Sequence, residues 1–150
     1  MRSSITPRRC AVLLVALFLL SAGMLPVVSR DDLGRTRSLA ETQHEIVMLL
    51  IKQKEYRKAV SEADKIFSMD WPEDQEPLLL SELRLLSDQF LRQGQASFSL
   101  QLIERNAKYF RTPESRIAIL KEKGYIHKCI GQDDKAMEYF REAMRLEKTD

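Results

Sequence analysis

Cysteine, glycine and proline are all scarce in this chain, and its charges are nearly balanced. Two cysteines cannot build a disulfide framework, and five glycines and five prolines in 150 residues are too few for a loop-rich β-sandwich or a low-complexity linker. Lys and Arg number 24 against 22 Asp and Glu, and this net charge of +2 does not suggest nucleic-acid binding. The sequence therefore indicates one folded body without a nucleic-acid partner.

Catalytic signatures are also absent from the sequence. It has no glycine-rich phosphate loop, no nucleophile elbow and no paired-cysteine zinc motif. The only histidines are His44 and His127, and His127 stands two residues from Cys129, which points the two side chains apart on a helix. We therefore predict no enzyme activity, no catalytic residue, no cofactor and no metal site. His127 is expected at a packing position with one nitrogen hydrogen-bonded, and Cys129 as a small core residue.

Residues 1–29 have the composition of an export signal. They contain Arg2, Arg8 and Arg9 but no acidic residue, and residues 10–29 are uncharged around a continuously apolar core at 11–20. A basic start followed by a short apolar stretch is typical of a secretory signal peptide. Twenty uncharged residues can also just span a bilayer, so an uncleaved membrane anchor fits the same pattern.

Both alternatives place residues 30–150 on the exported side of a membrane, in the periplasm or at the outer face of the inner membrane, and secreted if the signal is cleaved. This exported part has 21 basic and 22 acidic residues, so the positive excess belongs to the signal. Contact with the membrane is expected only through residues 10–29, and only if they are retained.

The remaining sequence has the periodicity of helices. Residues 30–37 are polar and aperiodic and are expected to form a tether, with Ser38 as the first N-cap. Period-two alternation is absent and β-branched residues are sparse, which predicts an all-α domain over 38–150. The expected helices are 39–53, 56–69, 74–92, 96–110, 113–129 and 133–147. Thr112 is expected to cap the fifth of them, followed by Pro113 in its first turn.

The expected helices repeat in pairs. Small residues stand in the second helix of each pair, with offsets of 40 and 37, at Ala59, Ser99 and Ala136. The turn before each of them falls five residues earlier, at Lys54, Gly94 and Gly131.

On these residues the sequence resembles the tetratricopeptide repeat family. The best match is 117–150, with further repeats at about 40–73 and 80–113. The resemblance implies a short right-handed solenoid of three antiparallel helix pairs behind the N-terminal signal or anchor helix. The residues that it assigns to packing between helices are Ala59, Ser87, Ser99, Gly124, Ala136, Phe140 and Ala143.

One helix pair cannot bury its apolar stripe alone, so the pairs must stack. The large residues expected to fill the space are Ile46, Leu50, Leu83, Leu86, Phe90, Leu120, Phe140 and Met144. The last helix leaves two alternatives, since Met137 and its neighbours either face inward or leave an apolar edge for a partner or a second copy. The apolar run 46–51 is expected to be covered on several sides.

The first helix of each pair carries candidate binding residues. In the resembling family these helices line the concave side of the array. Steps of three or four residues along that side give His44, Met48, Lys52, Arg84, Asp88, Arg92, Lys121, Tyr125 and Lys128. The functional interpretation is a groove with basic margins that binds a segment carrying acidic groups. The alternative is an ordinary solvated helix face.

The sequence thus predicts a non-catalytic scaffold that binds a protein or peptide on the exported side of the membrane. The alternative function is a structural subunit of an envelope complex, or a homo-oligomer that associates through the apolar ends of the array, in particular its C-terminal helix.

Overall fold

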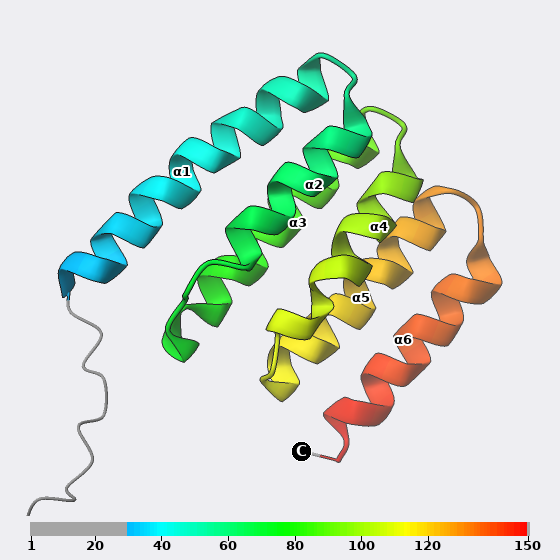
Figure 1. The fold of residues 1–150 in the computed structure, drawn as a ribbon. Helices are drawn as coiled ribbons and strands as arrows, with labels where there is room; N and C mark the ends of the chain where they lie inside the picture. The colour runs from blue at the N-terminus through cyan, green and yellow to red at the C-terminus, as the bar shows by residue number, and fades with distance from the viewer. Residues whose placement is uncertain (1–29, 150) are drawn as a thin grey trace, which may run out of the picture.

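The computed structural model describes residues 30–149, and within this range the chain is all-helical without a β-strand (Figure 1). The six α-helices are α1 (Arg30–Lys52), α2 (Tyr56–Phe67), α3 (Glu76–Arg92), α4 (Ala96–Asn106), α5 (Pro113–Cys129) and α6 (Asp133–Glu147). Short 3₁₀ turns at Glu73–Gln75 and Ala107–Tyr109 precede α3 and follow α4. The expected signal or anchor lies outside the described residues. None of the helices in 30–149 has the length and apolar character that crossing a bilayer requires.

The helices form three antiparallel pairs, α1 with α2, α3 with α4, and α5 with α6. Neighbouring pairs are joined because α1 contacts α3, α3 contacts α5, and α2 contacts α4. In Figure 1, α2 lies in front of α3 and α4 lies in front of α5. The first helices of the pairs therefore form one layer and the second helices another, and the first helices all run in the same direction.

The three turns inside the pairs have the same backbone geometry. Lys54, Gly94 and Gly131 each adopt a left-handed conformation, with φ of 62°, 70° and 72°. The residue after each turn donates its N–H to a carbonyl five residues earlier, in the bonds Glu55 to Leu50, Gln95 to Phe90 and Gln132 to His127. Ala59, Ser99 and Ala136 then donate their N–H groups to the carbonyls of Glu55, Gln95 and Gln132. The small residues aligned from the sequence thus hold equivalent places.

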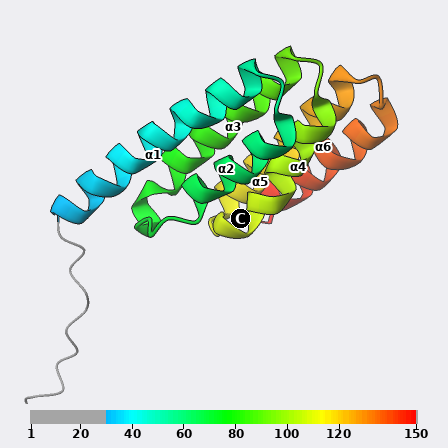
Figure 2. The same ribbon diagram turned by 45° about the horizontal axis from the view of Figure 1, so that its top comes forward.

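The expected tether is wrong, because residues 30–37 form the first turns of α1. Polar residues without proline are compatible with a helix, and the single Gly34 weakens it by only about 1 kcal/mol. Ser38 lies inside the helix and is no cap. The Arg37 guanidinium donates to Gln75 Oε1 at 2.5 Å and ties this extension to the start of α3. As a result α1 extends beyond α2 and α3 at its N-terminal end (Figure 2).

The other five helices were predicted correctly to within three or four residues. The α5 and α6 bounds agree with the sequence prediction, and Thr112 caps α5 by accepting the Ser115 N–H at 3.3 Å. Trp71 and Pro72 separate α2 from α3 as expected.

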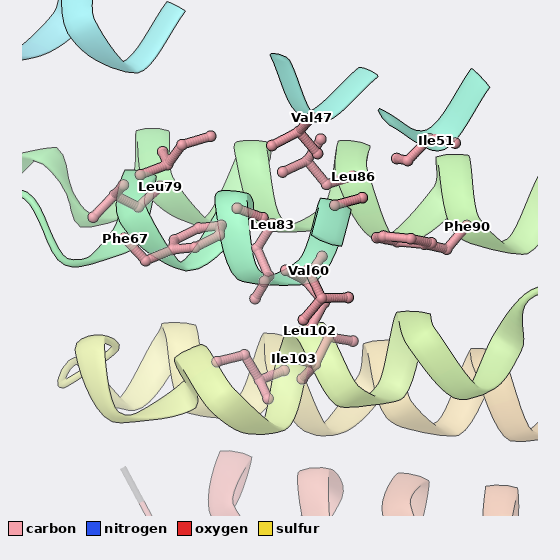
Figure 3. Packing of buried hydrophobic residues seen from close by; sticks show 14 of the residues in the cluster. Val47, Ile51, Val60, Phe67, Leu79, Leu83, Leu86, Phe90, Leu102 and Ile103 are labelled. Atoms are coloured by element: carbon pink, nitrogen blue, oxygen red, sulfur yellow. The ribbon is translucent and has the colours of Figure 1, made fainter. Parts of the chain in front are cut away.

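The core is centred on α3, which packs between the other helices of the first two pairs (Figure 3). Leu83, Leu86 and Phe90 are fully buried along α3. Around them lie buried side chains of α1, α2 and α4: Val47, Ile51, Val60, Phe67, Leu102 and Ile103. Tyr56 of α2 also contacts Phe90, with ring centroids 6.3 Å apart. The first and second pairs therefore share one core.

Two of the expected core residues are wrong. Ile46 is 40% exposed and Met144 is 51% exposed, although Leu50, Leu120 and Phe140 are half-buried. The expectation that the apolar run 46–51 is covered on several sides also fails, since Leu49 is 55% exposed. The reason is that α2 and α3 cover only the side of α1 that carries Val47 and Ile51.

The packing residues assigned by the resemblance are buried with one exception, the half-buried Phe140. Ser87 of α3 and Ser99 of α4 face each other, with their hydroxyl oxygens 2.6 Å apart. Gly124 of α5 lies against the Phe140 ring, and a Cβ on Gly124 would come within 2.7 Å of Phe140 Cε1. Small side chains therefore set the spacing within the second and third pairs.

Glu76 joins the start of α3 to the start of α5. Its buried carboxylate accepts the backbone N–H groups of Arg111 and Thr112, both at 3.0 Å, and the Thr112 hydroxyl at 2.6 Å. Burial alone would raise the pKa of Glu76, but these hydrogen bonds, together with one from the Ser115 side chain, outweigh it. They lower the pKa from 4.5 to about 2. The ionised form of Glu76 thus links the second pair to the third.

The shared turn geometry predicts that substitutions at two of the turns change the free energy of unfolding in opposite directions. Gly94→Ala should lower the free energy of unfolding by about 1 kcal/mol, because alanine disfavours a positive φ, although no atom crowds its Cβ. Lys54→Gly should raise it by about 0.5 kcal/mol for the converse reason. Urea denaturation measures both. Gly34→Ala is the matched control inside α1 and should be stabilising, so a stabilising Gly94→Ala would contradict this account.

The Glu76 hydrogen bonds predict a pH dependence of stability. Since the pKa is lowered in the folded state, the stabilisation is complete above pH 4.5 and is lost as the pH falls toward 2. The shift corresponds to about 3 kcal/mol. Glu76→Gln should therefore lower the free energy of unfolding at pH 7 and flatten its decline between pH 4.5 and 2. Equal declines in the variant and the wild type, measured by urea denaturation at each pH, would show that Glu76 has no such role.

Candidate functional site

The candidate binding residues lie on the first helices of the three pairs, and we call the surface of these helices the first-helix face. On α1 and α3 they comprise His44, Met48, Lys52, Arg84, Asp88 and Arg92, and on α5 Lys121, Tyr125 and Lys128. Met48 is half-buried and packs against the core, whereas Tyr125 is 55% exposed.

The residues that begin the first two sets of three point toward the next helix pair. His44 Nδ1 on α1 lies 2.6 Å from Glu82 Oε1 on α3. The imidazole nitrogen donates in this bond, because an ionised carboxylate only accepts. Arg84 Nε on α3 similarly lies 3.7 Å from Glu122 Oε2 on α5. Lys121 has no further pair beside it and instead forms an ion pair with Glu147 of α6.

These contacts reduce the basic character expected from the sequence. Glu82 and Glu122 were not among the predicted site residues, yet Glu82 stands beside His44 and Glu122 stands beside Arg84. Arg92 is also paired, with its Nε 2.6 Å from Asp88 Oδ2. Steps of three or four residues missed both glutamates because they lie two residues from Arg84 and one from Lys121, outside that row.

Glu122 lies between α3 and α5 on this face. Burial raises the pKa of Glu122, the Arg84 charge opposes this effect, and the Asp88 charge adds to it, so that the pKa stays above its ordinary value. The centre of the face thus carries neighbouring charges of both signs.

One edge of the face keeps a basic row. Lys52, Arg92 and Lys128 are exposed in the last turns of α1, α3 and α5. Because the first helices run in the same direction, the three cations lie at the same end of the layer (Figure 1). Each is favourably placed beside the negative end of its helix dipole.

A pocket of about 540 Å³ opens near the other end of the face, and we call it the α1–α3 pocket. Its residues come from the middle of α1, from the first three turns of α3 and from the end of α2 with the segment that follows: Arg37, Ala40, Glu41, His44, Glu45, Ile66, Trp71, Leu78, Leu79, Glu82 and Leu85. Only His44 was among the predicted binding residues. The first turns of α1, which were expected to be a tether, contribute Arg37 to the lining of this pocket.

Apolar and acidic groups meet in the α1–α3 pocket. Leu78 and Leu85, one above the other on α3, are 47% and 45% exposed, and Trp71 is held by its indole N–H, which donates to the Ile66 carbonyl at 2.7 Å. Glu41 and Glu45 stand four residues apart on α1 and share one side of that helix. Neither has an ion-pair partner within residues 30–149.

His127 of α5 is a packing residue against α6. It is buried, its Nδ1 lies 2.7 Å from Gln132 Oε1, and its ring stacks on Tyr139, which confirms the packing position expected for it. Cys129, by contrast, is exposed, so the expectation of a core cysteine is wrong. Among the described residues, no three His, Cys, Asp or Glu side chains are grouped as a metal site would require.

Comparison of the chain with protein-family models, with curated proteins and with solved structures finds no match. The case for a function therefore depends on the geometry of the first-helix face and on the two ends of the helix stack.

Proposed function

We propose that the six helices form a tetratricopeptide-repeat-like array, a short right-handed solenoid, and that the array is a non-catalytic scaffold for protein or peptide binding. The first-helix face is then its concave side. In this proposal the scaffold works on the exported side of a membrane, an assignment that rests on the composition of residues 1–29 alone.

The equivalent turns support the repeat assignment. Left-handed residues at Lys54, Gly94 and Gly131 and the same hydrogen bonds after each of them give three hairpins of one design. The contacts between successive first helices, such as His44 with Glu82, then repeat along the stack. Stacked hairpins of one design present their first helices as a continuous surface, which is the surface that helical repeat proteins use for binding.

The observation that carries the binding role is the α1–α3 pocket on that surface. Its volume of about 540 Å³ falls in the range typical of ligand sites, about 300–1,000 Å³. Leu78 and Leu85 remain almost half exposed in it, and Tyr125 is exposed farther along the same face. Apolar side chains left in a concave setting beside charged groups are typical of peptide-binding surfaces.

A second function has its own supporting observation, the exposed apolar residues at the two ends of the stack. Leu39, Ile46 and Leu49 are 40–56% exposed on α1, and Met137 and Met144 are 44% and 51% exposed on α6. A structural subunit or homo-oligomer would bury these ends against neighbouring molecules.

Two matched variants separate the functions. The face variant combines Lys52→Glu with Lys128→Glu and Tyr125→Ala, all at exposed positions of the first-helix face. The end variant combines Leu49→Glu with Met144→Glu. Each is used, like the wild type, to recover partners from the native envelope by affinity purification, and circular dichroism checks that each variant is folded.

The scaffold predicts that wild type and end variant recover the same partner, while the face variant recovers about tenfold less, as expected when two charged contacts and one aromatic contact are lost. Sedimentation of the wild type, the face variant and the end variant measures their assembly and so tests the second function. Loss of assembly in the end variant, with partner recovery by the face variant unchanged, would replace the scaffold by the structural subunit.

A further inference from the structure

The α1–α3 pocket differs from a second hollow, between α4 and α6, in how its charges are balanced. The hollow between α4 and α6, about 670 Å³, contains Glu104 and Glu138 together with Lys135, and Lys123 Nζ lies 3.8 Å from Glu104 Oε1. Its acidic groups therefore have cations beside them. The α1–α3 pocket has three carboxylates, and its single arginine, Arg37, is turned to Gln75.

The negative charges of Glu41 and Glu45 are unfavourable in the protein without a bound partner. Two like charges four residues apart on a helix repel each other. Glu82 adds a third carboxylate from α3, and its Oε1 lies 2.6 Å from His44 Nδ1. A cation placed between Glu41 and Glu45 would remove the repulsion and gain attraction from both. Among the described residues no three His, Cys, Asp or Glu side chains are grouped as a metal site would require, and the apolar lining beside the carboxylates favours a cation that belongs to a larger ligand.

The apolar part of the pocket defines the rest of that ligand. Leu78 and Leu85 are exposed on either side of Glu82 on α3, and Leu79 and Trp71 belong to the same lining. An apolar side chain that covers the two leucines removes them from water, at about 25 cal/mol for each Å² buried. The carboxylates of α1 face this apolar patch across the pocket, so one short segment can reach both.

We propose that the α1–α3 pocket binds a partner segment in which a large apolar side chain stands next to Lys or Arg. The apolar side chain covers Leu78 and Leu85, and the cation lies between Glu41 and Glu45. This inference rests on the scaffold function proposed above and specifies its partner, because it assigns a basic and apolar segment to this end of the face. The basic row of Lys52, Arg92 and Lys128 is left for acidic groups at the other end.

Trp71 gives the pocket its own reporter. It is the only tryptophan of the chain, it lines the pocket, and its indole is held in place by the Ile66 carbonyl. A side chain that enters the pocket displaces water near the indole and changes the fluorescence of Trp71, whereas binding elsewhere on the first-helix face leaves it unchanged.

The test titrates the purified protein with three tryptophan-free peptides of nine residues while Trp71 fluorescence is recorded. The first has Leu-Lys-Leu-Arg at its centre, flanked by Gly and Ser. The second has Glu in place of Lys and Arg, and the third has Ser in place of both Leu. We expect a saturable change with the first peptide, weakened by added salt, and at least about tenfold weaker binding of the other two.

Substitutions in the protein test whether the first peptide binds in the α1–α3 pocket. Glu41→Gln with Glu45→Gln should weaken the first peptide about tenfold, because two ion pairs are lost while the apolar contacts remain. Leu78→Ser with Leu85→Ser should weaken it by at least as much. The control, Glu104→Gln with Glu138→Gln in the α4–α6 hollow, removes the same charge and should leave the affinity within about twofold.

Several results would overturn the inference: no saturable change with the first peptide, equal affinity for the second, or no effect of the Glu41 and Glu45 substitutions. Spermidine binding as tightly as the first peptide would also overturn it, in favour of a small polyamine. These failures leave the scaffold function standing if the face variant still loses its envelope partner. The scaffold itself fails only when that variant recovers the partner as well as the wild type does.

Discussion

The structure depends on the apolar contact between successive helix pairs. A pair of helices has too little surface to bury its own apolar stripe, so the second pair supplies what the first one lacks. Leu83, Leu86 and Phe90 of α3 are fully buried only because α1 and α2 cover them from one side while α4 covers the other. Without this shared core, Val47 and Phe67 of the first pair would be exposed to water, and the pair would lose its main source of stability.

Polar groups fix how the pairs are placed on this core. The buried carboxylate of Glu76 satisfies two backbone N–H groups at the start of α5, which otherwise have no partner inside that helix. The pairs of His44 with Glu82 and of Arg84 with Glu122 bridge successive first helices at the surface, where such ion pairs contribute little to stability. The larger effect of the Arg84–Glu122 pair is on charge, because it places opposite charges at the centre of the first-helix face, between the acidic pocket at one end and the basic row at the other.

Much of the fold could be predicted from the sequence because residues with strong conformational preferences mark the ends of several helices. Thr112 with Pro113 sets the start of α5, and Gly94 and Gly131 set the left-handed turns that only glycine adopts without strain. The extension of α1 could not be predicted in this way. Residues 30–37 have no apolar period, and their helix is stabilised by continuity with the packed part of α1 and by the contact of Arg37 with Gln75.

The site was less predictable, since it depends on side chains that neighbour one another only after the pairs stack. The spacing of residues along a single helix identifies His44. It cannot identify Glu82 as its neighbour, because Glu82 lies on a different helix. Leu78 and Leu85 have the spacing of core residues, but they line the α1–α3 pocket and stay almost half exposed. The exposed Ile46 and Met144 at the ends of the stack were missed for a related reason, because a sequence pattern does not tell where the stack stops.

The most direct test of this account compares two signals during one urea denaturation of the wild-type protein. Trp71 fluorescence reports on the junction of α2 and α3, and far-ultraviolet circular dichroism reports on all the helices together. If the pairs are stable only through their shared core, both signals should change in a single transition with the same midpoint and slope. A fluorescence transition separate from the loss of helix would contradict the account, because the pairs would then unfold independently.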